Sequence, residues 1–497
     1  MESVVGSILE TAVLTLYYLV LGVLALYGVH RSVLLWLYLR HRRRQVLPAP
    51  PAEWPTVTVQ LPLYNEKYVA RRLIDAVCRL DYPRHLLEIQ VLDDSTDDTR
   101  ERVARRVAHH RRRGINIHHL HREDRSGYKA GALAAGLAQA QGKLVAVFDA
   151  DFVPAPDFLK ATVPSFQDSQ VGMVQARWEH LNRGYSLLTR IQAILLDGHF
   201  LIEHTARQRS GCFFNFNGTA GIWRRRAIEE AGGWQHDTLT EDLDLSYRAQ
   251  LAGWKFLYLP QVAVPSELPV DIDGFKSQQH RWAKGSVQTG RKLLARVLRA
   301  PLPWRVKSEA VVHLTNNGAY PLMLLLSLLV FPAMYLRRGD PFNTLLWVDL
   351  PLFLAATGSV LLFYSVSQAV RGDGSWRRLC YLPLLLGVGI GLSVNNSRAV
   401  LGGLVQRGGV FYRTPKYSIQ DHGRQKTRPR GYRAVRSLSW WLEGLVFAYL
   451  ACCCWAACSF GMWLSLPFLL LFLQGYGYMF WLSLQAGTRR LPPAPTA

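Results

Sequence analysis

The sequence predicts an α/β domain with a mostly parallel sheet, joined to an α-helical transmembrane domain. Short β-prone runs alternate with helical segments between residues 56 and 269, a pattern typical of parallel sheets covered by helices on both faces. Apolar runs long enough to cross a bilayer lie on either side of this region. The chain of 497 residues is also longer than one ordinary domain.

The first apolar run extends from Ile8 to Leu39 and closes on the basic cluster 40–44. It is too long for a signal peptide and lacks a small-residue cleavage site, so we predict an uncleaved transmembrane helix within residues 1–45. Because basic clusters flank membrane spans on the cytoplasmic side, we expect the chain that follows to lie in the cytoplasm.

The α/β region opens after a short proline-rich linker. Its most informative strand is the run Leu144–Phe148, whose continuous apolar residues are typical of a strand buried on both faces. The other expected strands are 56–61, 87–92 and 116–120, and the expected helices between them include 103–112 and 129–139.

Acidic side chains lie at the ends of two predicted strands and at the start of a further predicted helix. Asp149 and Asp151 come directly after the buried strand, where ligands bind in open α/β sheets. Two carboxylates one residue apart can share a hard cation such as Mg²⁺ or Mn²⁺. The pair Asp93-Asp94 ends another strand, and Thr240-Glu241-Asp242 opens a helix. Taken singly, each is also consistent with a polar strand end, a loop or an ordinary helix cap.

Two amphipathic segments follow the acidic motifs. Residues 184–203 have one apolar face, which fits a helix facing the protein core as well as one on a membrane surface. Residues 275–308 contain no acid and many Lys and Arg residues, with Leu and Val on one side. We expect this basic segment to lie at the cytoplasmic membrane interface.

The C-terminal part, residues 309–497, is predicted to be a transmembrane domain. Basic loops at 371–378 and 405–437 flank a short apolar run at 379–394, and the second loop has nine Lys/Arg and one acid. If both loops are cytoplasmic, that run is re-entrant or interfacial. The remaining runs are long enough to span: 310–336, 344–370, 438–459 and 463–484.

The net charge of +22 could serve nucleic acid, an anionic membrane face or phosphorylated substrates. No nucleic-acid-binding motif accompanies it, so we expect no nucleic-acid partner. The seven cysteines show no metal-ligand spacing.

These acidic motifs combine with the run Gln278 to Trp282, which reads Gln-Gln-His-Arg-Trp, and with the runs 60–66, 127–133 and 216–221. Together they resemble the processive, membrane-embedded family 2 glycosyltransferases of the cellulose synthase superfamily. The resemblance is strongest to the cellulose-synthase-like A group of β-mannan and glucomannan synthases. It implies a GT-A catalytic domain over residues 56–290 in the cytoplasm, with the chain in the plasma or inner membrane.

The resemblance also implies roles for individual residues. Asp242 is the expected catalytic base, beside Glu241, and Asp149 and Asp151 hold the metal, Mg²⁺ or Mn²⁺. The run 411–416 resembles the gating loop of the family, with Arg413 where the family has valine. The implied donor-binding residues are Asp93, Asp94, Lys129, Asp149, Gln278, Arg281, Trp282, Thr414 and Lys416. The implied acceptor-binding residues are Phe216, Asn217, Gly218, Thr219 and Trp282.

The chemistry of these residues agrees with an inverting glycosyl transfer. A carboxylate can take the proton of the acceptor hydroxyl, and cations can neutralise a leaving nucleoside diphosphate. We therefore expect a hexose polymerase that uses UDP-glucose or GDP-mannose, extends a growing β-linked polysaccharide and moves it across the bilayer. One alternative is a transferase that adds a single sugar to a ceramide-like or other lipid. A second is a non-catalytic basic protein that binds anionic lipids.

Overall fold

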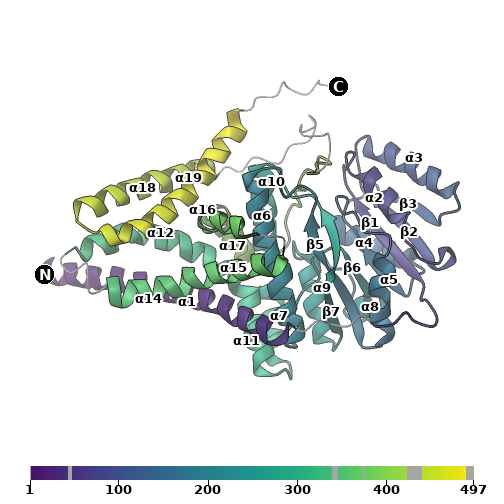
Figure 1. The fold of residues 1–497 in the computed structure, drawn as a ribbon, viewed down its shortest axis with the longest axis horizontal. Coiled ribbons are helices and arrows are strands. Elements are labelled where there is room, and N and C mark those ends of the chain that lie inside the picture. The colour runs from purple at the N-terminus through teal and green to yellow at the C-terminus, as the bar shows by residue number, and fades with distance from the viewer. Residues whose placement is uncertain (1, 43–47, 339–344, 373–374, 422–438, 489–497) are drawn as a thin grey trace.

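The computed structural model describes residues 2–42, 48–338, 345–372, 375–421 and 439–488. Figure 1 shows two parts, a sheet with helices packed around it and an elongated group of helices beside it. The helix α1 (Glu2–His41) lies in the elongated group, although the sheet follows it directly in the sequence.

The sheet has seven strands in the order β3-β2-β1-β4-β6-β5-β7. The pairs β1–β2, β1–β4, β2–β3 and β5–β7 are parallel, and β6 is antiparallel to both of its neighbours. The predicted mostly parallel sheet is therefore confirmed. The strands are β1 (Val57–Leu63), β2 (Leu87–Asp93), β3 (Ile117–His121), β4 (Leu144–Val147), β5 (Val171–His180), β6 (Gly221–Arg224) and β7 (Lys255–Ser266).

The central strand β4 is buried on both faces, as its sequence indicates. Leu144 and Ala146 belong to one apolar cluster, while Val145 and Val147 belong to another on the opposite face. This alternation follows from the period of two residues in a strand. The first cluster also contains residues of α2 (Ala70–Val77), α3 (Thr99–Arg111) and α5 (Phe158–Thr162). The second contains residues of α4 (Tyr128–Gln139), α8 (Arg225–Glu230) and α9 (Glu241–Leu251).

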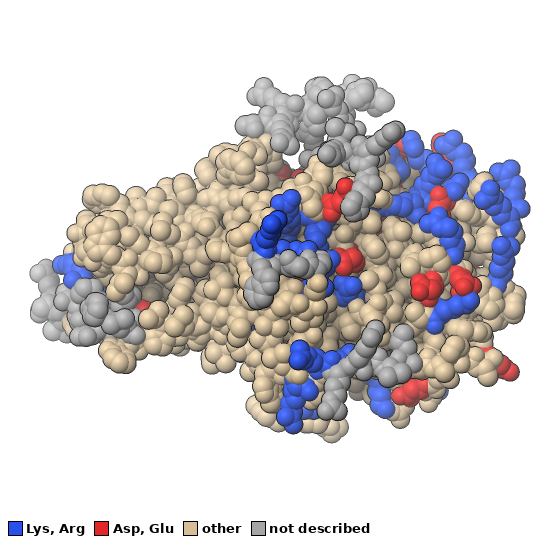
Figure 2. Space-filling model, in the orientation of Figure 1, with Lys and Arg blue, Asp and Glu red and all other residues tan. Residues whose placement is uncertain are grey.

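Among the residues that the structure describes, five helical stretches are long and apolar enough to cross a membrane: 7–41, 304–336, 347–371, 440–459 and 463–486. They correspond to the five spans that the sequence predicts. Figure 2 shows few charged side chains on the surface of the elongated part except near its far end. The α-helices within the five apolar stretches are α1, α11 (Trp304–Thr315), α12 (Ala319–Leu336), α14 (Leu350–Phe353), α15 (Ser359–Arg371), α18 (Trp440–Ser459) and α19 (Leu466–Thr488).

The apolar run at 379–394 falls into two helices, α16 (Leu382–Gly391) and α17 (Ser393–Val405). Their axes are bent by 41° at the break. This geometry fits either a broken span or a re-entrant segment, so the expectation that this run is not a simple span stays open.

The segment expected as one amphipathic helix at 184–203 has a more complex form. It consists of α6 (Leu187–Asp197), a π-helix (Gly198–Glu203) and α7 (His204–Arg209). Ile191 and Ile194 are buried in a cluster with residues of α1, α15 and α16. This apolar face is therefore covered by protein, which favours the core-facing alternative.

The basic segment forms α10 (Ile272–Arg299), which lies between the sheet and the elongated helices (Figure 1). Many of its cationic side chains contact protein groups. Lys276 is fully buried and forms an ion pair with Glu443 of α18 at 2.6 Å. Arg291 donates to the carbonyl of Gly403, and Lys292 to Asp237. At these three positions α10 is therefore bound to other parts of the protein, and its expected place at the membrane interface stays a prediction.

Candidate active site

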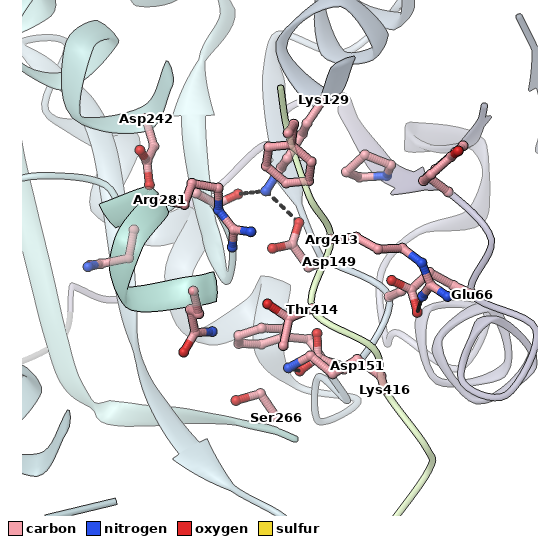
Figure 3. A pocket seen from close by; sticks show the side chains of 18 of the residues that line it. Glu66, Lys129, Asp149, Asp151, Asp242, Ser266, Arg281, Arg413, Thr414 and Lys416 are labelled. Atoms are coloured by element: carbon pink, nitrogen blue, oxygen red, sulfur yellow. Dashed lines mark hydrogen bonds and ion pairs between the residues drawn. The ribbon is translucent and has the colours of Figure 1, made fainter. Parts of the chain in front are cut away.

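A cleft opens where the carboxyl ends of β1, β2 and β4 meet the start of α9, the first half of α10 and the segment 411–416. Figure 3 shows that this segment crosses the cleft. The cleft brings together most of the residues that the sequence singles out. Those that line it are Asp94, Lys129, Asp149, Asp151, Asn217, Gly218, Glu241, Asp242, Gln278, Arg281, Trp282, Thr414 and Lys416.

Lys129 and Asp149 form the centre of the cleft. The Lys129 ammonium lies 2.5 Å from a carboxylate oxygen of Asp149 and donates to the carbonyl of Gly218 at 2.8 Å. Burial alone would lower the pKa of Lys129, but Asp149 and Glu241 outweigh it and raise that pKa. Lys129 is therefore a firmly charged cation facing the cleft.

Asp151 is held on the other side of the same turn. One of its carboxylate oxygens accepts from the backbone N–H of Glu267 at 3.0 Å and from the Lys416 ammonium at 2.8 Å. Glu267 in turn accepts from the backbone N–H groups of Tyr417 and Ile419. These bonds fix the segment 414–419 against the strand ends, although it is about 265 residues away in the sequence.

The two acids at the start of α9, Glu241 and Asp242, both have raised pKa values. Burial, followed by the charge of Glu241, raises the pKa of Asp242 to about 7. Burial likewise raises the pKa of Glu241, against the opposing charge of Lys129. A carboxylate with a pKa near the working pH is suited to general base catalysis.

Gly218 brings backbone close to these acids. Its φ is +81°, and a Cβ built there would lie 3.0 Å from Asp242 Oδ2 and 3.4 Å from Lys129 Nζ. Any other residue would therefore pay a conformational cost and intrude between the base and the cation.

Residues of α10 meet the segment 411–416 across the cleft. Arg281 donates to the carbonyl of Tyr412 at 2.9 Å, and its guanidinium lies 4.5 Å from the centre of the Phe411 ring. Gln278 and Trp282 line the cleft on the same helix. This arrangement offers a charged group and a flat apolar ring to a bound sugar phosphate.

Three expected site residues lie behind the lining instead of in it. Asp93 is fully buried and accepts hydrogen bonds from His119 and from the backbone N–H of Ser95. Phe216 is buried in the core, and Thr219 accepts from the backbone N–H of Asp149 through its hydroxyl. The structure thus places Asp94, rather than Asp93, where it can touch a ligand.

The structure adds cleft residues that have no role assigned from the sequence. Glu66 lies 3.3 Å from Arg413, and burial raises the pKa of Glu66 to about 8. Arg125 stacks on the ring of Tyr64, with 3.4 Å between the guanidinium carbon and the ring centre. Glu66 closes the motif at 60–66, which is the one local feature that points to it; the other contacts depend on tertiary packing.

The carboxylates fit a divalent metal that also takes ligands from a substrate. Among the described residues, no group of three or more His, Cys, Asp or Glu side chains could hold an ion alone. Mg²⁺ is commonly bound through one or two carboxylates plus substrate phosphates and water, which matches Asp149 and Asp151. Lys129 and Lys416 pair with these two carboxylates in the structure.

Comparison with known proteins places this site in a family. A family model described as "Glycosyltransferase like family 2" matches residues 55–285. Glucomannan 4-beta-mannosyltransferase 1 of Oryza sativa subsp. japonica is 46% identical over 254 residues, which cover 50% of this chain and 48% of that protein. Probable glucomannan 4-beta-mannosyltransferase 3 of the same organism is 38% identical over 368 residues, covering 72% of this chain and 64% of that protein. The chain spans about half the length of the first of these relatives.

Among solved structures, the mannosyltransferase PcManGT from Pyrobaculum calidifontis, in complex with GDP-Man and Mn²⁺, is similar with a TM-score of 0.52. Its identity to this chain is 24%, and the match covers 80% of this chain and 99% of that one. This likeness identifies the fold. From the family match, the relatives and the sheet order, residues 55–285 form a family 2 glycosyltransferase domain with a GT-A-like fold.

Proposed function

We propose that this protein is a membrane-embedded β-glycan synthase that transfers hexose from a nucleotide sugar to a growing polysaccharide and passes the chain across the bilayer. The observation that carries the proposal is the cleft itself. There, Asp242, Lys129 and the acids of the β4 turn meet Arg281, in a chain whose described part has five helices able to span a membrane. The names of the relatives favour a β-mannan or glucomannan product.

In the proposed reaction, the acceptor hydroxyl attacks the anomeric carbon while the bond from that carbon to the diphosphate oxygen breaks. Asp242 takes the hydroxyl proton as the new glycosidic bond forms. The diphosphate leaves with the bonding electrons, and Lys129 and Arg281 balance its negative charge. A divalent metal bound through Asp149 and Asp151 would add charge neutralisation on the diphosphate.

The remaining lining residues suit the ends of the two substrates. Asp94, Arg125 and Tyr64 lie together at the β2 end of the cleft, which suits the base and ribose of the donor. Trp282 offers its ring to the acceptor sugar, and Asn217 and Gly218 line the same cleft. The segment 411–416 covers the site, and we propose that it excludes water when donor is bound.

The proposal also implies how the chain is arranged across the membrane. Residues 1–45 and 309–497 form the membrane domain, the region 275–308 connects it to the catalytic domain, and the loop 405–437 faces the cytoplasm, as its basic residues favour. Residues 422–437 of this loop lie outside the described residues. The plasma or inner membrane is the proposed location.

Synthesis can be tested with the purified full chain in lipid nanodiscs. The protein is given GDP-mannose or UDP-glucose, each with Mg²⁺ or Mn²⁺, and products are sized before and after digestion with β-mannanase or cellulase. We expect an enzyme-sensitive polymer that is absent with the Asp242→Asn variant. A product carrying one sugar on a lipid would establish the lipid transferase instead, and no product from either donor would contradict the proposal.

Topology can be tested separately. Gln420, which lies in the loop 405–437 just before the residues outside the described structure, is exposed. A cysteine at this position, in a background lacking the exposed Cys380, Cys452 and Cys458, should react with an impermeant maleimide from the cytoplasmic side alone. Labelling from the opposite side would overturn the proposed orientation.

A further inference from the structure

A second cavity, distinct from the cleft, lies where the sheet domain meets the elongated helices. Its volume is about 290 Å³. Figure 2 shows Lys and Arg side chains gathered at this junction. The side chains that give the cavity its character are Arg183, Arg190, Arg377, Arg378, Tyr381 and Asp421.

Positive charge exceeds negative charge around this cavity. Arg183 is already compensated, because both ends of its guanidinium bond the carboxylate of Asp197 at 2.9 and 2.8 Å. Arg190 donates to the Tyr381 hydroxyl at 3.0 Å, and Arg377 is exposed. Within the described part of the chain, neither Arg190 nor Arg377 forms an ion pair. These two guanidinium groups therefore remain available to an anion.

The cavity has an apolar wall as well as charged groups. Ile194 of α6 lines it, and the same residue packs in a cluster with Leu382 and Leu385 of α16. The segment that carries Arg377 and Tyr381 leads directly into α16. A ligand bound here would thus have its charged group beside arginines and its remainder beside the helices of the elongated part. That combination suits an amphiphile better than a free anion.

The chain just after the segment 411–416 contributes to the same cavity. Asp421 accepts from the backbone N–H of Gly184 at 2.8 Å, and its own N–H donates to the carbonyl of Leu181 at 2.8 Å. Five residues earlier in the chain, Lys416 contacts Asp151 in the cleft. A ligand in the cavity would therefore touch Asp421, five residues after Lys416 of the segment that covers the cleft.

We propose that this arginine cavity binds the phosphate of an anionic phospholipid from the leaflet that faces the sheet domain. Arg190 and Arg377 hold the phosphate oxygens, and the acyl chains follow the apolar surface of α16. Guanidinium groups match phosphate oxygens in geometry, and anionic lipids concentrate at basic pockets beside membrane helices.

The test is lipid binding to the delipidated full chain in detergent, followed by native mass spectrometry. Phosphatidylglycerol and phosphatidylcholine with matched acyl chains are the probes. We expect the protein to prefer phosphatidylglycerol, and Arg190→Gln/Arg377→Gln to weaken its binding about thirtyfold. Arg377→Gln alone, a change at an exposed side chain, should weaken binding about fivefold, with thermal unfolding unchanged.

The matched control is Arg112→Gln/Arg113→Gln, which removes the same charge from exposed positions at the end of α3. This variant should keep the preference for phosphatidylglycerol. The proposal is overturned if the cavity variants retain that preference. It is also overturned if millimolar inorganic phosphate displaces the lipid, since the site would then recognise a free anion.

Discussion

The role of Asp242 can be tested by Asp242→Asn, which removes the basic oxygen and keeps the side-chain shape. General base catalysis typically contributes about 10²–10⁴-fold to rate. At about 1.36 kcal/mol per tenfold change, the variant should lose about 3–5 kcal/mol of transition-state stabilisation. We expect kcat for sugar transfer to fall by that factor. Donor binding should be retained, because within the described structure no hydrogen bond or ion pair joins Asp242 to Lys129 or Arg281.

The pH profile gives a second, independent measure. With a pKa of about 7, the Asp242 side chain is half ionised near neutral pH. Turnover should therefore rise about tenfold per pH unit below pH 6 and level off above pH 8. The Asn variant should show no such rise from this group.

The same pKa sets the sign of the stability effect. Burial raises the folded-state pKa of Asp242 above its unfolded value, so the folded state binds the proton more tightly. The corresponding stabilisation is complete below about pH 4 and is lost as the pH rises through about 7. At pH 8 the Asn variant, which cannot ionise, should unfold at the same temperature as the parent or higher.

The assay measures nucleoside diphosphate release and polymer formation in nanodiscs between pH 5 and 9. Asp237→Asn is the matched control, because Asp237 is an acid of the preceding loop that pairs with Lys292 and does not line the cleft. Near-normal turnover of Asp242→Asn, or an equal loss in the control, would refute the assignment of Asp242 as the base.

Three further predictions concern the surroundings of the base. Gly218→Ala should lower kcat about a hundredfold by misplacing the base. Gly233→Ala, with a similar φ of +70° and open space around it, should leave kcat unchanged, and equal kcat values would contradict this. Lys276→Met should lower the free energy of unfolding by about 3–5 kcal/mol, because it leaves the buried Glu443 carboxylate without its ion-pair partner. The double variant Lys276→Met/Glu443→Leu should recover part of that stability in thermal unfolding. A double variant no more stable than the single one would contradict this prediction. Chelation by EDTA should stop transfer, and Asp149→Ala should weaken metal and donor binding together in calorimetry, whereas full activity in EDTA would exclude a metal role.

Local sequence patterns predicted the central strand, the long apolar helices and several acids of the cleft. The run Leu144–Phe148 is apolar at every position, which predicts a strand buried on both faces, and β4 has that environment. The five apolar runs predict, through their length and composition, the helices of the described chain that are long and apolar enough to cross a membrane. The acids at the end of β4 and the start of α9 were identified from position, because strand ends and helix starts are recognisable in sequence.

Contacts between distant segments were decided by the tertiary structure alone. The resemblance named both Asp93 and Asp94 as donor-binding residues, but Asp93 at the end of β2 is buried against His119, whereas Asp94, the next residue, lines the cleft. The pairing of Arg413 with Glu66 likewise joins residues far apart in the chain. A local pattern carries no information about such partners, since they depend on how packed elements approach one another. The basic helix α10 shows the same limit. Its composition indicates a membrane interface, which stays a prediction, but only packing reveals the ion pair between Lys276 and Glu443 of α18.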